Sequence, residues 1–173
     1  LIAFAAQAQA QGIEFVHDKK FAEVLAMAKK ERKLVFIDAY TTWCGPCKRL
    51  AAQVFPDPAV GEYYNAHFVN TKFDMEKEEG PEIAARYGVR AYPTLLWLDG
   101  EGNVVHRVVG GLEPQGLIEA GKKAADPTPG ILNGMRVRYN NGDREPDFLS
   151  DYLNTMSAAG EKYDGVFKEY LEK

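Results

Sequence analysis

The chain has 173 residues, of which 46% are hydrophobic and 27% are charged. This length is enough to bury one substantial core and too short for two ordinary domains. The formal net charge is -4 and charges of both signs are interspersed, which argues against a basic surface for nucleic acid. No apolar stretch approaches the roughly 20 residues that a membrane-spanning helix needs, so we expect a soluble mature protein.

The first ten residues carry no charge and end in Ala8-Gln9-Ala10, with a small residue on each side of a spacer. This pattern is typical of the apolar part and cleavage site of a secretory signal peptide. Because the sequence begins without Met and without a basic segment, we interpret residues 1–10 as a signal-peptide remnant and expect Gln11 as the mature N-terminus. A disordered Ala-rich tail is the alternative. A signal peptide predicts a periplasmic or secreted protein in an oxidising compartment.

The patterning of residues 19–125 predicts alternating helices and strands. Phe21, Val24 and Ala28 fall on one side of an amphipathic helix. Residues 34–40 form a short, mostly apolar run, which is typical of a strand covered on both faces. In chain order we expect helices over 19–32, from the Cys-x-x-Cys motif to Pro56, around 60–64 with a cap near Asp57, over 81–87 and over 113–125; the strands are expected over 34–40, 67–73, 94–98 and 104–109.

This order of elements predicts an α/β fold, a mixed sheet flanked by helices, over residues 11–126. A composition break rich in Pro and Gly starts at Asp126 and separates residues 127–173. There we expect a linker with turn residues around Gly142 and then a helical-hairpin extension. Its apolar residues are interpreted as packing faces rather than ligand contacts; they are Phe148, Leu149, Tyr152, Leu153 and Met156 on one helix, and Tyr163, Val166, Phe167, Tyr170 and Leu171 on the other.

The two cysteines, Cys44 and Cys47, follow the first apolar strand directly. A disulfide between them would close so short a loop that it removes little chain entropy, so a structural staple explains the pair poorly. Zinc needs four ligands, and the sequence has no second Cys-x-x-Cys and no paired His, so no metal is expected. Disulfide exchange needs an attacking thiolate and a second thiol that resolves the mixed disulfide, and this pair supplies both.

The motif lies where the strand gives way to a helix, and its residues suit that position. Free N–H groups and the helix dipole lower a thiol pKa below about 8.5, so we expect Cys44 to be the exposed attacking thiol. Cys47, one turn later, is expected to be the shielded resolving thiol. Gly45 permits a tight entry into the helix, and Pro46 suits an early helical position. A rigid spacer favours a stable disulfide and hence a reducing poise.

The residues from Trp43 to Cys47 read Trp-Cys-Gly-Pro-Cys and resemble the thioredoxin family, whose signature pentapeptide they match in full. The resemblance covers about Phe15 to Ala125 and implies a thioredoxin-like fold. It further implies that Asp38, in the apolar strand before the motif, is the buried carboxylate that relays a proton to the resolving thiol. Without the cysteines, Asp38 would be interpreted as an ordinary polar residue at a strand end.

A second segment, Tyr92-Pro93-Thr94, resembles the cis-proline loop of the same family, which faces the active site and binds the substrate backbone. The resemblance therefore implies substrate contacts from Tyr92 and Pro93, together with Trp43, Gly45 and Pro46. Trp43 in the core and a trans Pro93 at a strand edge are the alternatives.

The chain differs from the family pattern near this predicted site. Counting back from Asp74 places Asn70 where many thioredoxins have a lysine near the buried aspartate, so we expect a differently tuned proton relay. Tyr92 is bulkier than the aliphatic residue usual before the proline and is expected to narrow or redirect substrate choice. The acidic run Glu76–Glu79 is interpreted as a solvated loop.

We therefore predict an exported protein-disulfide reductase that works through the Cys44/Cys47 dithiol without a cofactor. Its expected partners are disulfide-containing protein substrates and a membrane or other redox partner that re-reduces it. Neither nucleic acid nor metal is expected. Two alternatives stay open: a disulfide oxidase or isomerase with the same dithiol, and a non-catalytic interaction module with a thioredoxin fold.

Overall fold

A computed structural model describes residues 11–126 and 128–172 of the chain. The signal-peptide remnant predicted at residues 1–10 lies outside the described residues. The chain divides into two compact units, with the boundary in the sequence between Ala125 and Asp126. Along the described part of the chain, no helix has the length and apolar character needed to cross a membrane.

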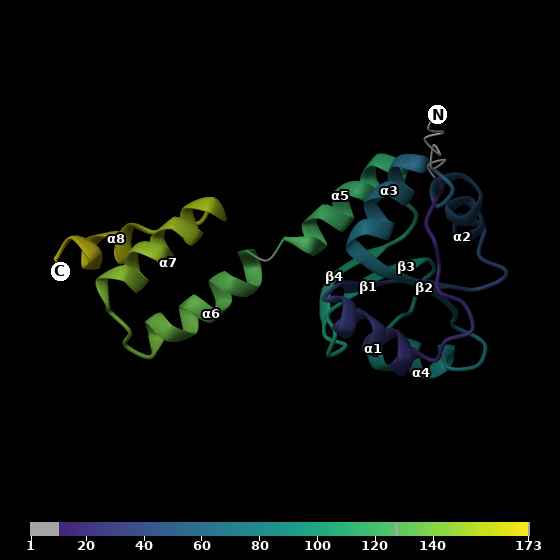
Figure 1. Cartoon of the computed structure of the whole chain (residues 1–173), viewed down its shortest axis with the longest axis horizontal. Coiled ribbons are helices and arrows are strands. Elements are labelled where there is room, and N and C mark those ends of the chain that lie inside the picture. Colours follow the sequence, from purple (N-terminus) through teal and green to yellow (C-terminus); the bar gives the residue numbers. More distant parts are fainter. Residues whose placement is uncertain (1–10, 127, 173) are drawn as a thin grey trace, which may run out of the picture. The chain divides into compact units, whose positions relative to one another are not determined.

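The first unit is a four-stranded mixed sheet with helices on both faces (Figure 1). The strand order is β2-β1-β3-β4, with β1 parallel to β2 and antiparallel to β3, and with β3 antiparallel to β4. The predicted α/β fold is therefore confirmed. The strands are β1 (Leu34–Tyr40), β2 (Phe68–Asp74), β3 (Thr94–Leu98) and β4 (Val104–Val109), and the helices are α1 (Phe21–Glu31), α2 (Gly45–Arg49) with the π-helical turn η1 (Leu50–Val54), α3 (Pro58–His67), α4 (Gly80–Tyr87) and α5 (Pro114–Ala125).

The central strand β1 is buried on both faces because helices cover each of them. Val35 and Ile37 join the core on the side of α1 and α4. Phe36 joins the core on the other side, with residues of η1, α3 and α5. Figure 1 shows these two helical layers on opposite sides of the sheet. Side chains alternate along a strand, so Asp38 lies on the same face as Phe36.

Local signals in the sequence explain where the helices beside the site begin and end. The Asp57 side chain accepts hydrogen bonds from the N–H groups of Ala59 and Val60, which caps the start of α3. Pro58 then occupies the first turn, where a missing N–H costs nothing. Gly88 ends α4 in the left-handed conformation, with φ 60°. These ends agree with those predicted.

The second unit contains α6 (Thr128–Asn140), α7 (Pro146–Ala158) and α8 (Asp164–Leu171). The expected connector is therefore wrong over 131–139, which is helical. The reason is a further apolar face: Leu132, Met135 and Tyr139 fall at helical spacing and pack into the core of this unit. Gly142 adopts a positive φ of 90° in the turn after α6.

The two apolar faces predicted in the extension differ in burial. All five residues predicted on α7 are buried. On α8 only Val166 is buried, whereas Phe167 is 45% and Leu171 is 67% exposed. Within this unit the face predicted on α8 therefore packs through Val166, and packing of its other residues stays a prediction.

Candidate active site

The two cysteines form a disulfide at the start of α2. Cys44 is the N-cap residue, and Cys47 lies in the first turn with the Cα atoms 5.3 Å apart. The backbone N–H of Cys47 donates a hydrogen bond of 3.1 Å to the Cys44 Sγ. Pro46 sits between them in the first turn, and α2 runs directly into η1, so the disulfide begins a continuous helical segment.

Cys44 is not the exposed residue that the sequence predicted. In this disulfide form Cys44 is 3% exposed and Cys47 is 4% exposed. The reason is the S–S bond, which holds the Cys44 sulfur against the first turn of the helix. There this sulfur accepts a hydrogen bond from the Cys47 N–H. The exposed groups of the motif are instead its neighbours Trp43, Gly45 and Pro46.

Asp38 lies in the middle of the sheet and is 3% exposed. Its Oδ1 atom has no hydrogen-bond partner within the described residues. Burial raises the pKa of the Asp38 carboxyl to about 7, and the positive charge of Lys72 acts in the opposite direction. A carboxyl group with this pKa can both accept and release a proton near neutral pH.

Asp38 and Cys47 line the same pocket, which has a volume of about 230 Å³. The structure therefore places the predicted proton carrier and the predicted resolving cysteine on one pocket. The remaining lining comes from the end of β1, from α2 and η1, and from β2; it comprises Tyr40, Thr41, Thr42, Lys48, Ala51, Phe55 and Lys72.

The cation near Asp38 is Lys72, which the sequence analysis missed. Counting back from Asp74 pointed to Asn70, but Asp38 stands directly opposite Lys72 in the β1–β2 register. The Asn70 side chain instead donates to the Asn65 Oδ1 at 3.2 Å and to a backbone oxygen of the N-terminal segment. Alternation along β2 does not reveal which residue pairs with Asp38; only the strand register does.

Trp43 is held at the surface beside the disulfide and is 63% exposed. Its ring packs edge-to-face on Tyr92, with centroids 5.8 Å apart. Its Nε1–H donates to both carboxylate oxygens of Glu76 at 3.0 Å. Trp43 is therefore not a core residue. The interpretation of Glu76–Glu79 as a merely solvated loop is incomplete, because Glu76 orients this indole and Glu79 accepts the N–H of Phe21.

The segment before β3 completes the surface around the motif. The Tyr92–Pro93 peptide bond is cis, and Pro93 is buried. The carbonyl oxygen of Pro93 accepts a hydrogen bond of 2.8 Å from the N–H of Gly110, which ties this segment to the end of β4. Tyr92 is half-buried and contacts Trp43, so the two aromatic residues predicted to bind substrate lie together.

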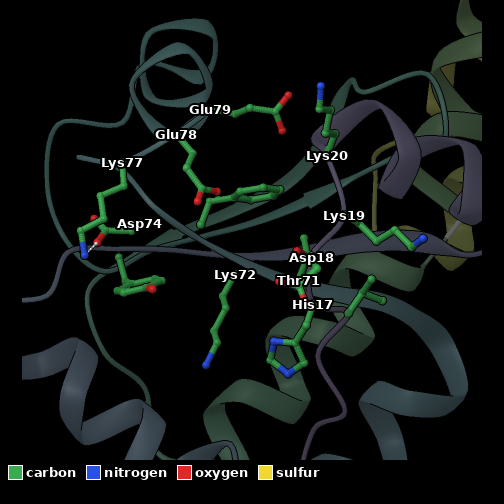
Figure 2. A pocket seen from close by; sticks show the side chains of 13 residues that line it. His17, Asp18, Lys19, Lys20, Thr71, Lys72, Asp74, Lys77, Glu78 and Glu79 are labelled. Carbon is green, nitrogen blue, oxygen red and sulfur yellow. Dashed lines mark ion pairs between the residues drawn. The ribbon is translucent and has the colours of Figure 1, made fainter.

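A more voluminous pocket, of about 590 Å³, lies along β2 and contains neither cysteine (Figure 2). Figure 2 shows charged side chains around it from two segments, His17–Lys20 and Asp74–Glu79, with an ion pair between Lys77 and Asp74. Tyr40 and Lys72 line both this pocket and the pocket of Asp38. Across residues 11–126 and 128–172, no three His, Cys, Asp or Glu side chains gather as metal ligands.

Comparisons with known proteins agree with this geometry over the first unit. A sequence model described as a thioredoxin-like domain matches residues 21–125. The solution structure of a putative disulphide-isomerase from Bacteroides thetaiotaomicron is 50% identical, with a TM-score of 0.60, over 69% of this chain and 98% of that chain. Thioredoxin-2 of Pyricularia oryzae is 39% identical over 109 residues, or 61% of this chain.

The extent of these matches differs between relatives. A thioredoxin-like protein of Synechocystis is 35% identical over 58% of this chain and 90% of its own length. The match spans 58% of the Pyricularia protein, and less than a third of two larger curated relatives. The family match ends at residue 125, so it does not cover the three helices of the second unit.

Proposed function

Because the chain belongs to the thioredoxin-like family, we propose that it is an exported protein-disulfide reductase. The observation that carries the proposal is the Cys44–Cys47 disulfide at the start of a helix, with the buried Asp38 beside Cys47 in one pocket. A redox-active dithiol and a proton carrier are the two groups that disulfide reduction requires.

The first step joins Cys44 to the substrate. In the reduced protein the Cys44 thiolate attacks one sulfur of a substrate disulfide, and the other substrate sulfur leaves with the bonding electron pair and takes up a proton. The N–H of Cys47, which is 3.1 Å from the Cys44 Sγ, stabilises negative charge on that sulfur. Cys44 therefore carries the nucleophile and forms a mixed disulfide.

The second step releases the substrate. The Cys47 thiol gives its proton to the Asp38 carboxylate, and its sulfur attacks the Cys44 sulfur of the mixed disulfide. The second substrate sulfur leaves as a thiolate, and the Cys44–Cys47 disulfide forms. One protein dithiol and one substrate disulfide thus become one protein disulfide and one substrate dithiol. With a pKa of about 7, the Asp38 carboxyl is suited to this transfer at neutral pH.

The surface around the disulfide supports contact with an extended polypeptide. Trp43 and Tyr92 offer exposed aromatic area next to the exposed Gly45 and Pro46. Pro93 has no N–H of its own, and it begins the segment that leads into β3. We propose that these five residues bind the substrate backbone on either side of its cysteine.

The proposal also specifies the direction of the reaction, namely reduction of substrate disulfides rather than their isomerisation. The Gly45-Pro46 spacer favours a stable disulfide and thus the reducing direction. The relative from Bacteroides is named a putative disulphide-isomerase, which favours isomerase activity as the second candidate. The reduction potential of the Cys44/Cys47 couple, measured against glutathione, separates the two, because a reductase requires a clearly more negative potential than an isomerase.

We further propose that residues 11–126 carry the chemistry, that residues 127–173 are an accessory extension, and that a membrane or other redox partner returns electrons to the disulfide.

Export is supported by the uncharged segment that ends in Ala8-Gln9-Ala10. Export is tested by expressing the full precursor in a bacterium and locating the mature protein by fractionation and N-terminal sequencing.

The enzymatic proposal is tested by insulin reduction with the full chain. Cys44→Ser should abolish turnover. Cys47→Ser should stop at the mixed disulfide and retain substrates covalently, so that mass spectrometry identifies them. Unchanged turnover in Cys44→Ser would overturn the proposal. The interaction module would be favoured by a different result: the unmodified protein shows no turnover, and both variants still bind the substrate.

A further inference from the structure

The outer edge of β2 is only partly covered by the rest of the chain. β2 lies at one end of the sheet, so one of its two edges has no full strand beside it. The N-terminal segment begins to fill this place: Phe15 forms a parallel bridge with Asn70, and the Val16 N–H donates to the Asn70 carbonyl oxygen at 2.8 Å. After Val16, this segment makes no further backbone hydrogen bond to β2 within the described residues. A fifth strand thus starts beside β2 and stops after one bridge.

Asp18 turns the N-terminal segment away from the sheet. Its φ of 54° is left-handed and does not fit an extended strand. Helix α1 starts three residues later, and the N–H of its first residue, Phe21, donates to the Glu79 carboxylate at 2.8 Å. This hydrogen bond ties the segment His17–Lys20 to the loop before α4, and both segments line the larger pocket.

The place that the interrupted strand leaves beside β2 is the pocket of about 590 Å³ (Figure 2). Its lining includes four consecutive residues of β2, Thr71–Asp74, together with His17–Lys20 and Lys77–Glu79. The volume lies within the range of about 300–1,000 Å³ that is usual for ligand-binding pockets. Four residues of a strand extend over about 13 Å, so an extended segment of similar length fits along this edge.

The backbone of Lys72 points to this open edge. Along a strand, the N–H and C=O groups of successive residues point to opposite edges. The Met75 N–H donates to Tyr40 of β1, whereas Asn70 accepts from the N-terminal segment, so the even-numbered residues of β2 direct their backbone groups outward. Within residues 11–126, the N-terminal segment supplies no partner for the Lys72 N–H or C=O. The pocket therefore offers one backbone donor and one backbone acceptor to an occupant.

The two faces of β2 present different charges to the pocket. The Lys72 side chain lies on the face of Asp38, since both residues line the smaller pocket. The next residue, Phe73, points to the other face and packs against the core beside α1 and α4. Figure 2 shows Lys72 on one side of the strand and Glu78 and Glu79 on the other. A cation thus borders one face of the open edge, and carboxylates border the opposite face.

Several of the lining charges are already engaged. Lys77 pairs with Asp74 at 3.2 Å, and Glu79 accepts the first N–H of α1. In contrast, neither Lys72 nor Glu78 forms an ion pair with any residue that the structure describes. Neighbouring residues of an added strand point to opposite faces. A strand with an acidic residue next to a basic one therefore places a carboxylate near Lys72 and a cation near Glu78.

We propose that this edge pocket binds an extended segment of a partner protein, which adds to β2 as a strand at Lys72 and carries neighbouring acidic and basic residues. Its backbone exchanges hydrogen bonds with the Lys72 N–H and C=O, and its two charged side chains contact Lys72 and Glu78. In such added strands the backbone bonds provide affinity and the side chains provide specificity. Neither cysteine lines the pocket, so this binding site goes beyond the proposed function.

The first test is binding of a defined peptide to the full chain. The probe is acetyl-Thr-Val-Glu-Lys-Val-Thr-amide, added to the ¹⁵N-labelled disulfide form and followed by NMR. We expect the largest chemical-shift changes at the amides of Lys72 and Asp74 and in His17–Lys20. The absence of changes at millimolar peptide, or changes confined to the residues around Cys44, would overturn the proposal.

Methylation of the peptide nitrogens tests whether the probe pairs as a strand. In an added strand, alternate N–H groups point to β2 and the others to solvent. One probe is methylated on the nitrogens of its first, third and fifth residues, and a second probe on those of its second, fourth and sixth residues. We expect one of the two to bind about tenfold more weakly than the other, because it loses its hydrogen bonds to Lys72. Similar affinities of the two probes would rule out strand addition.

A charge exchange tests the side-chain contacts. Glu78→Lys should weaken binding of the probe about fivefold, and replacing the lysine of the probe by glutamate should restore the affinity. Glu62→Lys is the matched control, because Glu62 is exposed on α3 and does not line the pocket. Equal effects of the two variants would contradict the assigned contacts. Insulin reduction by the unmodified protein tests the proposed function separately, since it uses no such peptide.

Discussion

The two sides of the disulfide are built in opposite ways. On one side, Trp43 and Tyr92 form an aromatic surface, and the indole is oriented by a surface carboxylate of Glu76. On the other side, Asp38 is buried, its Oδ1 has no hydrogen-bond partner among the residues that the structure describes, and the positive charge of Lys72 acts on it. One side is suited to recognising a polypeptide and the other to moving a proton.

The two sides also differ in how they affect the free energy of unfolding. Exposed aromatic side chains change the free energy of unfolding little, because they are solvated to a similar degree in the folded and the unfolded protein. A buried carboxyl group whose pKa is raised from 3.8 to about 7 destabilises the folded protein whenever it is ionised. Substitutions on each side of the disulfide should therefore have different effects.

Asp38→Asn should have the largest effect on stability, and the effect should depend on pH. Because the folded-state pKa of Asp38 lies above the unfolded value, the folded protein holds the extra proton between about pH 4 and 7, and its stability falls as pH rises through that window. A shift of about 3 units corresponds to about 4 kcal/mol. The variant should therefore be more stable than the unmodified protein by up to this amount at pH 8 and gain little at pH 4.

Urea unfolding of the disulfide form at pH 4 and pH 8 measures this difference. Asp57→Asn is the matched control, because asparagine also caps helices, and its effect should stay below about 1 kcal/mol at both pH values. An Asp38→Asn variant whose advantage does not change with pH would show that this carboxyl group has an ordinary pKa.

Lys72→Met should have the next largest effect, on the proton affinity of Asp38. The positive charge of Lys72 lowers the pKa of the Asp38 carboxyl, so its removal should raise that pKa further above 7. The titration of the Asp38 carboxyl carbon, followed by NMR in the disulfide form, measures the shift. Asn70→Ala is the control and should leave the titration in place; a larger shift in Asn70→Ala would restore the assignment made by counting along the sequence.

Glu76→Ala should have the smallest effect, confined to substrate recognition. Losing the carboxylate that accepts the Trp43 Nε1–H frees the indole to turn, at a cost of about 1 kcal/mol in substrate binding. The KM for insulin should rise about fivefold while kcat stays the same. Glu78→Ala serves as the matched variant in the same loop. A fall in kcat in Glu76→Ala would mean that the recognition side also takes part in the chemistry.

Much of the fold and the reactive pair was predictable because local patterns determine them. The continuous apolar run predicted β1 over residues 34–40, and the structure has the same bounds. The Gly-Pro spacer predicted a helix starting at the motif, and α2 begins at Gly45. The burial of Asp38, which the resemblance to the thioredoxin family implied, is also found, since Asp38 is 3% exposed.

What could not be predicted depends on contacts between distant segments. Lys72 is opposite Asp38 only because of the β1–β2 register, and no spacing within β2 reveals that register. The hydrogen bond from Trp43 to Glu76 joins residues that are 33 positions apart in the sequence. The low exposure of Cys44 belongs to the disulfide form, a redox state that the sequence does not specify.

The pH dependence of alkylation in the fully reduced protein measures directly whether Cys44 is the nucleophilic thiol. Iodoacetamide labelling is followed from pH 5 to 10, with mass spectrometry assigning each adduct. The account predicts that Cys44 is labelled first, with a pKa clearly below the ordinary value of about 8.5, while Cys47 is labelled far more slowly. Labelling of both cysteines at similar rates with a midpoint near 8.5 would contradict it.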